Sequence, residues 1–110
     1  MRAVSDGGAA PRVQEVAQAL AVRMARLNPK WSRAAGAHGQ CEQAAWRFRW
    51  ALEERGIASE LVTCDEPPHV AVVVSGCVID LTARQFDSAA EYPMITTEPK
   101  WRAWLAAVSS

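Results

Sequence analysis

The sequence contains a cysteine, a histidine and an aspartate whose spacing would let the three side chains react together. Cys41 lies in the segment HGQCEQAAWRF, where a loop of small residues gives way to a helical pattern. A cysteine at a helix N-terminus feels the positive end of the helix dipole and unpaired backbone N–H groups, and both favour the thiolate. A thiolate is a nucleophile. Cys41 is therefore a candidate nucleophile for covalent catalysis, provided that the chain also supplies a base and a group that orients that base.

The base and its partner are predicted by the segment HVAVVVSGCVIDL, residues 69–81. Two apolar, β-branched runs joined at Ser75–Gly76 are typical of a β-hairpin with a two-residue turn. With that turn, the alternation of side chains puts His69 and Asp80 on one face, as diagonal neighbours roughly 7–8 Å apart. Aspartate is disfavoured inside strands, so its place beside a histidine favours an orienting role.

These three segments together resemble the papain-like and transglutaminase-like superfamily of cysteine hydrolases. GQC (residues 39–41) is similar to the transglutaminase nucleophile motif, HVAV (69–72) to its histidine strand and VIDLT (78–82) to the strand with the acidic residue. The similarity covers about residues 31–86 and extends to the small papain-fold glutamine deamidase domains of bacterial toxins and effectors. The resemblance implies a Cys41–His69–Asp80 triad that needs no cofactor and no metal.

The resemblance also implies a reaction. Cys41 would attack a carboxamide carbon to form a thioester, which water resolves in deamidation or peptide cleavage and an amine resolves in transglutamination. A small domain has little room for a peptide groove, which favours glutamine deamidation of a protein substrate, with a cysteine peptidase as the alternative. Larger superfamily members use a side chain upstream of the cysteine to stabilise the oxyanion. The residues that could take this oxyanion or substrate-binding role are Trp31, His38 and Gln40.

The same residues allow other interpretations. Cys41 could be a buried thiol, because cysteine is often buried, and Asp80 could pair with Arg84. A zinc site is a further alternative, but structural zinc sites normally show close ligand pairs, and only one is present here. The candidate ligands would be His38, Cys41, Cys64, His69 and Cys77.

The helices and strands expected from the sequence patterns together predict an α+β fold. Helical patterns start at Pro11 and run again from about Gln40 to Arg55, where Gly56 is a natural C-cap, and a short final helix begins at Pro99. The second face of the hairpin is expected to be a core face, formed by Val70, Val72, Val74, Cys77, Ile79 and Leu81. The nucleophile-bearing helix would then pack on a small antiparallel sheet, with flanking N- and C-terminal helices. Residues 1–10 are predicted to be a flexible lead-in, and residues 11–110 a single domain.

The composition limits the classes of function. The 110 residues are half hydrophobic and carry 12 acidic and 12 basic side chains, which indicates one globular domain without the basic surface of a nucleic-acid-binding protein. No apolar run approaches the length of a membrane span. Residues 1–11 lack the apolar stretch of a signal peptide, so we expect a cytoplasmic protein, without excluding delivery by a dedicated machine.

Two tryptophans suggest a different class of function. Trp46 and Trp50 lie four residues apart, away from the apolar stripe of the predicted second helix. They would either contact the C-terminal helix or form an exposed patch for a protein partner. A non-catalytic protein-binding module that uses this tryptophan-rich surface is therefore a second hypothesis.

Overall fold

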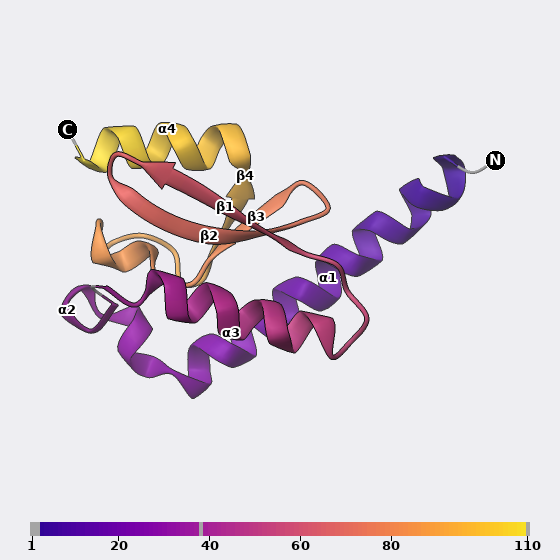
Figure 1. The fold of residues 1–110 in the computed structure, drawn as a ribbon, viewed down its shortest axis with the longest axis horizontal. Coiled ribbons are helices and arrows are strands. Elements are labelled where there is room, and N and C mark those ends of the chain that lie inside the picture. Colours follow the sequence, from indigo (N-terminus) through magenta and orange to yellow (C-terminus); the bar gives the residue numbers. More distant parts are fainter. Residues whose placement is uncertain (1–2, 38, 110) are drawn as a thin grey trace.

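The protein folds into three layers, with helices on both faces of one β-sheet (Figure 1). This computed structural model describes residues 3–37 and 39–109, with side chains from residue 12 onward. Within these ranges the helices are α1 (Ala3–Leu27), α2 (Ala34–Ala37), α3 (Cys41–Glu53) and α4 (Glu98–Ser109), with short 3-10 helices η1 (Pro29–Ser32) and η2 (Ala83–Gln85). The strands are β1 (Glu60–Asp65), β2 (Pro68–Val74), β3 (Cys77–Asp80) and β4 (Met94–Thr97). The predicted α+β class is confirmed.

The sheet is an antiparallel meander in which each strand pairs with the next one along the chain. β2 and β3 are joined by a two-residue turn at Ser75 and Gly76, with φ of 50° and 78°. Positive φ at both central residues is what a type I′ hairpin turn requires. Val74 pairs with Cys77 across this turn. The predicted turn and register of the hairpin are therefore confirmed.

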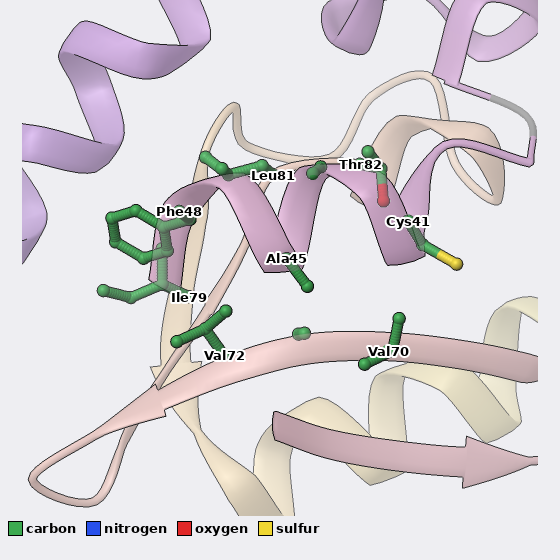
Figure 2. A pocket seen from close by; sticks show the side chains of 10 residues that line it. Cys41, Ala45, Phe48, Val70, Val72, Ile79, Leu81 and Thr82 are labelled. Carbon is green, nitrogen blue, oxygen red and sulfur yellow. The ribbon is translucent and has the colours of Figure 1, made fainter. Parts of the chain in front are cut away.

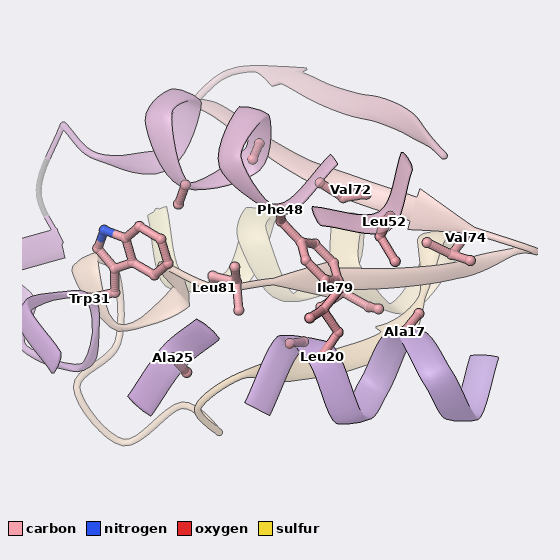
Figure 3. Packing of buried hydrophobic residues seen from close by; sticks show 13 residues of the cluster. Ala17, Leu20, Ala25, Trp31, Phe48, Leu52, Val72, Val74, Ile79 and Leu81 are labelled. Carbon is pink, nitrogen blue, oxygen red and sulfur yellow. The ribbon is translucent and has the colours of Figure 1, made fainter. Parts of the chain in front are cut away.

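The larger core lies between the sheet and the helices α1 and α3 (Figure 3). Its sheet side is the apolar hairpin face that the alternating pattern predicted. Phe48 is fully buried at its centre, and alanines around it let the helices approach the sheet closely. The buried members are Ala17, Leu20, Ala21, Ala25, Trp31, Ala44, Ala45, Phe48, Leu52, Val72, Val74, Ile79 and Leu81.

The other face of the sheet is also buried, because α4 covers it (Figure 1). Trp101 and Leu105, one helical turn apart on α4, form a second cluster with Val62, Ala71 and Val78. The sequence pattern predicted a single core face for the hairpin, and the structure has two. Since α4 and α3 lie on opposite sides of the sheet, the predicted alternative in which the α3 tryptophans contact the C-terminal helix is wrong.

α3 ends at Glu53, two residues before the predicted Arg55, and Gly56 forms the predicted cap. Gly56 has φ of 72°, its N–H donates to the Glu53 carbonyl at 2.9 Å, and the Ile57 N–H donates to the Leu52 carbonyl at 3.0 Å. These two bonds form a Schellman motif, in which a left-handed residue satisfies the last carbonyls of a helix. Ile57 also packs against the core that contains Leu52. The cap thus fixes where the chain leaves α3 to enter β1.

Two elements differ from the sequence-based expectation. α1 begins at Ala3, and Pro11, predicted as its first turn, lies inside the helix. The early turns of α1 extend beyond the sheet (Figure 1). β4 was not predicted, because four residues are too few to show a strand pattern. Although α1 spans 25 residues, no helix within residues 3–37 and 39–109 is both long and apolar enough to cross a membrane.

Replacing Gly56 with alanine is expected to lower the free energy of unfolding by about 1–2 kcal/mol, because a residue with a Cβ is strained in the left-handed region. Apart from the two chain neighbours, no atom lies within 4 Å of the added Cβ, so the loss reports backbone conformation. Gly56→Asn is the control, since asparagine tolerates this conformation better. Urea unfolding should rank wild type above Gly56→Asn and Gly56→Asn above Gly56→Ala. Equal stability of the two variants would contradict the capping role.

Candidate active site

His69 and Asp80 form a buried pair on the sheet face that α4 covers. His69 is the second residue of β2 and Asp80 is the last residue of β3. His69 Nε2 lies 2.7 Å from Asp80 Oδ2, and neither side chain is exposed. The hairpin therefore brings together the two residues that its sequence pattern predicted to be neighbours. Arg84 instead donates to the carbonyl oxygens of Ala90 and Ser32, so the alternative pairing of Asp80 with Arg84 is wrong.

The Asp80 carboxylate has further hydrogen-bond donors. The backbone N–H of Thr82 donates to Oδ1 at 3.0 Å, and the indole Nε1–H of Trp101 donates to Oδ2 at 2.9 Å. A buried carboxylate is strongly unfavourable unless its oxygens are hydrogen-bonded, so these donors make the buried position tolerable. The sequence analysis did not identify Trp101, because its place in a short amphipathic helix gave no signal beyond core packing.

The imidazole of His69 is held on several sides. The ring of Phe86 meets it edge-on, with centroids 4.8 Å apart, and the amide Nε2 of Gln85 lies 3.3 Å from Nδ1. Gln85 Nε2 is also 3.2 Å from the hydroxyl of Thr82. Nε2 of His69 faces Asp80, and the other ring nitrogen, Nδ1, is the one that the Gln85 amide approaches. Sequence reasoning missed Gln85, which follows the hairpin in a segment without a regular pattern.

Cys41 is the first residue of α3, and its half-buried thiol interacts with His69. The hydrogen bond with His69 is the main cause that lowers the pKa of Cys41, and burial acts in the opposite direction. The positive charge of His69 and hydrogen bonds with the backbone of Val70 and Glu42 lower this pKa further. The helix start thus contributes to thiolate formation, as the sequence predicts for this position.

The pKa of His69 is shifted in the complementary direction. Burial by itself would lower this pKa, but the hydrogen bonds and charges of Asp80 and Cys41 outweigh burial and raise it to about 9. A lowered thiol pKa and a raised imidazole pKa both favour a thiolate–imidazolium pair. At Cys77, in contrast, burial raises the pKa. The structure therefore distinguishes Cys41 from a thiol that is merely packed in the core.

Cys41 lies at the end of a seam between α3 and the sheet. This seam is lined mainly by apolar side chains, including Ala45, Phe48 and Val72, and it has no room for a water molecule. Figure 2 shows the sulfur of Cys41 turned toward the start of β2, past Val70. A substrate would therefore reach the thiol from the outer side of the molecule.

The three residues predicted for oxyanion or substrate contacts have different positions. Gln40 directly precedes Cys41 as the N-cap residue of α3, and within the described part of the chain its buried Oε1 has no hydrogen-bond partner. Trp31 has no exposed surface, its ring packs in the larger core (Figure 3), and its Nε1 has no partner among the described residues. His38 lies outside the described residues. Gln40 is thus the one of the three that the structure places next to Cys41.

The described residues contain no group of three or more His, Cys, Asp and Glu side chains that could hold a metal ion. Comparison of the chain with protein-family models, with curated proteins and with solved structures found no match. The functional proposal therefore depends on the geometry of the site and on its motifs.

The pKa shifts predict how stability depends on pH. A histidine whose pKa rises on folding from 6.5 to about 9 stabilises the fold fully below pH 6.5, and this contribution is lost as the pH rises to about 9. A cysteine whose pKa is lowered below 9.0 has the opposite dependence, and its contribution is lost as the pH falls. Cys41→Ala removes the second contribution, while Asp80 still raises the pKa of His69. Between these pH values, the free energy of unfolding should therefore fall more steeply in Cys41→Ala than in the wild type.

Urea unfolding at several pH values within this range measures the slopes. Cys77→Ala is the matched control, because the pKa of Cys77 is raised and its ionisation on unfolding affects stability mainly above this range. Its slope should follow the wild type. A Cys41→Ala slope parallel to that of the wild type would contradict the expectation that Asp80 keeps the pKa of His69 raised once the thiol is removed.

Proposed function

We propose that the protein is a cysteine-dependent hydrolase or acyl transferase that acts on carboxamide groups of a protein substrate. Cys41 is the nucleophile, His69 transfers the proton and Asp80 orients His69. The observation that carries this proposal is the buried contact of 2.7 Å between His69 Nε2 and Asp80 Oδ2, beside a thiol whose pKa is lowered by His69. A papain-like or transglutaminase-like core is part of the proposal, because helix, histidine strand and aspartate strand follow one another in the order of that superfamily.

In the first half of the reaction, the Cys41 thiolate forms a C–S bond to the carboxamide carbon, and the carbonyl oxygen becomes an oxyanion. Backbone N–H groups at the start of α3, including that of Cys41, are the donors for this oxyanion. The His69 imidazolium gives its proton to the departing nitrogen as the C–N bond breaks. Ammonia leaves and a thioester remains on Cys41.

In the second half, neutral His69 takes a proton from water as the water oxygen attacks the thioester carbon. The C–S bond breaks, the electron pair returns to sulfur as the thiolate, and the product is a carboxylic acid. When an amine attacks in place of water, the same steps give a new amide. Asp80 stabilises the imidazolium in both halves of the cycle.

The surroundings of Cys41 favour a side-chain carboxamide as the substrate. The seam beside the thiol does not admit even a water molecule, so the substrate must meet Cys41 at the molecular surface. A glutamine side chain presents its amide at the end of a flexible stem and needs little binding surface. Peptide cleavage by the same residues is the alternative, and it differs from deamidation in its products.

A second candidate function is protein binding by the outer face of α3. Trp46 and Trp50 are 47% and 69% exposed, and the guanidinium of Arg49 lies 5.2 Å from the centroid of the Trp46 ring. Trp50 lines a shallow hollow of about 380 Å³ together with Glu53 and Glu54. Aromatic residues are enriched at the centres of protein interfaces, so this Trp46/Trp50 surface suits a protein partner.

Thiol reactivity tests the ion pair without a known substrate. At about pH 6, iodoacetamide should modify Cys41 much faster than Cys64 or Cys77, because the thiolate is the reactive form. His69→Gln should remove this advantage, since glutamine carries no charge that could stabilise the thiolate. Mass spectrometry of tryptic peptides measures the three rates in one sample. Equal rates for the three thiols in the wild type would contradict the proposed nucleophile.

Activity and stability together separate catalysis from folding. With casein as the probe substrate, ammonia release should fall by several orders of magnitude in Cys41→Ser, and the loss in Asp80→Asn should approach about 10⁴-fold. Cys41→Ser nearly conserves volume and should melt like the wild type. Asp80→Asn also conserves volume but removes the charge that compensates buried His69, so it should be folded at the assay temperature and melt below the wild type.

The products formed in the same assays show which of the three reactions the protein catalyses: deamidation, peptide cleavage or acyl transfer to an amine. New peptide termini would indicate a peptidase, and hydroxamates formed with added hydroxylamine would indicate acyl transfer to amines. If Cys41→Ser releases ammonia as fast as the wild type, the enzymatic proposal is wrong. The Trp46/Trp50 surface would then be the functional candidate.

A further inference from the structure

Trp101 reaches the site from the layer opposite to Cys41. It lies in the first turns of α4, is fully buried, and donates its Nε1–H to Asp80 Oδ2 at 2.9 Å. This is the same oxygen that meets His69 Nε2 at 2.7 Å. The indole ring also stacks on the imidazole of His69, with centroids 5.8 Å apart and planes 27° from parallel. One side chain therefore contacts both members of the buried pair.

Core packing alone does not account for a tryptophan at this position. The space between α4 and the sheet could be filled by an apolar side chain, whereas a buried indole N–H needs a hydrogen-bond acceptor. Asp80 is that acceptor, and it lies 21 positions away in the sequence, on another element. Thr82 holds the other carboxylate oxygen through its backbone N–H. Besides His69, one further donor therefore contacts each carboxylate oxygen, so the carboxylate has little freedom to rotate away from the imidazole.

We propose that Trp101 is a positioning residue of the Cys41 site, which holds the Asp80 carboxylate and the plane of the His69 ring in the geometry that serves the thiol. The proposal rests on the proposed function, because it assigns Trp101 a role in that site. It makes α4 part of the catalytic structure, although α4 and α3 lie on opposite faces of the sheet. Trp101 itself touches neither substrate nor the reacting sulfur.

Trp101→Phe tests the role, because it keeps an aromatic ring and removes the N–H donor. The matched control is Trp104→Phe on the same helix, since Trp104 packs edge-on against Phe86 and is not among the groups that meet the Asp80 carboxylate, which are His69, Thr82 and Trp101. Two quantities are measured in each variant: the pKa of His69 from NMR titration of its ring, assigned with His69→Gln, and the rate of Cys41 alkylation at about pH 6.

The positioning role predicts a lower His69 pKa and about a tenfold slower alkylation of Cys41 in Trp101→Phe, because a hydrogen bond to a charged group is lost and the carboxylate is held less well. Trp104→Phe should match the wild type in both quantities. If the indole merely shares the oxygen with His69, its removal would strengthen the His69–Asp80 contact and raise the His69 pKa. An unchanged or raised His69 pKa in folded Trp101→Phe therefore overturns the inference.

Two further results keep the inference separate from the proposed function. If wild-type Cys41 is no more reactive than Cys77 while Trp101→Phe still lowers the His69 pKa, the enzymatic proposal fails and the positioning contact stands. If Trp101→Phe does not fold, the indole N–H resonances of Asp80→Asn provide the test. The Trp101 resonance should shift strongly and the Trp104 resonance should not. An unshifted Trp101 resonance overturns the inference.

Discussion

The buried contact between His69 and Asp80 is the interaction on which the rest of this structure depends. A carboxylate without partners inside a protein is strongly unfavourable, and removing one member of a buried pair leaves the other uncompensated. The chain satisfies Asp80 with a local donor, the backbone N–H of Thr82, and with a distant one, the indole of Trp101. The hairpin, the turn that follows it and the last helix must therefore all be in place before the pair is stable. Fold and site form together.

The second constraint is that the thiol and the imidazole approach from different layers. Cys41 begins α3 on the side of the larger core, whereas His69 stacks against Trp101 on the α4 side. The two meet where β2 starts, because there the helix N-terminus lies over Val70 (Figure 2). Arg84 supports this meeting point by bonding the carbonyl of Ser32, before α3, from the segment that follows Asp80. This contact ties the segment that precedes α3 to the segment that follows β3.

Sequence patterns predicted the parts of the site that depend on local rules. The Ser75–Gly76 turn and the period-two alternation place His69 beside Asp80, and Gly56 ends α3, because both features are decided within a few residues. The contacts of Trp101 and Gln85 could not be predicted, since they join segments far apart in the chain whose packing no periodicity encodes. At the start of α1 a local rule failed. Proline is typical of the first turn of a helix, but α1 begins at Ala3 and continues through Pro11.

In the proposed cycle, the loss of charge on Cys41 would change His69 from an acid to a base. In the resting site, Asp80 and Cys41 together raise the pKa of His69 to about 9, so the ring carries the proton that the leaving nitrogen needs. Acylation consumes the thiolate and removes its share of that stabilisation, while burial still acts to lower the pKa. The pKa of His69 must then fall, and a base is most effective when its pKa lies near the working pH. In the proposed cycle, the same residue would therefore be an acid before the thioester forms and a base afterwards, because Cys41 would have lost its charge.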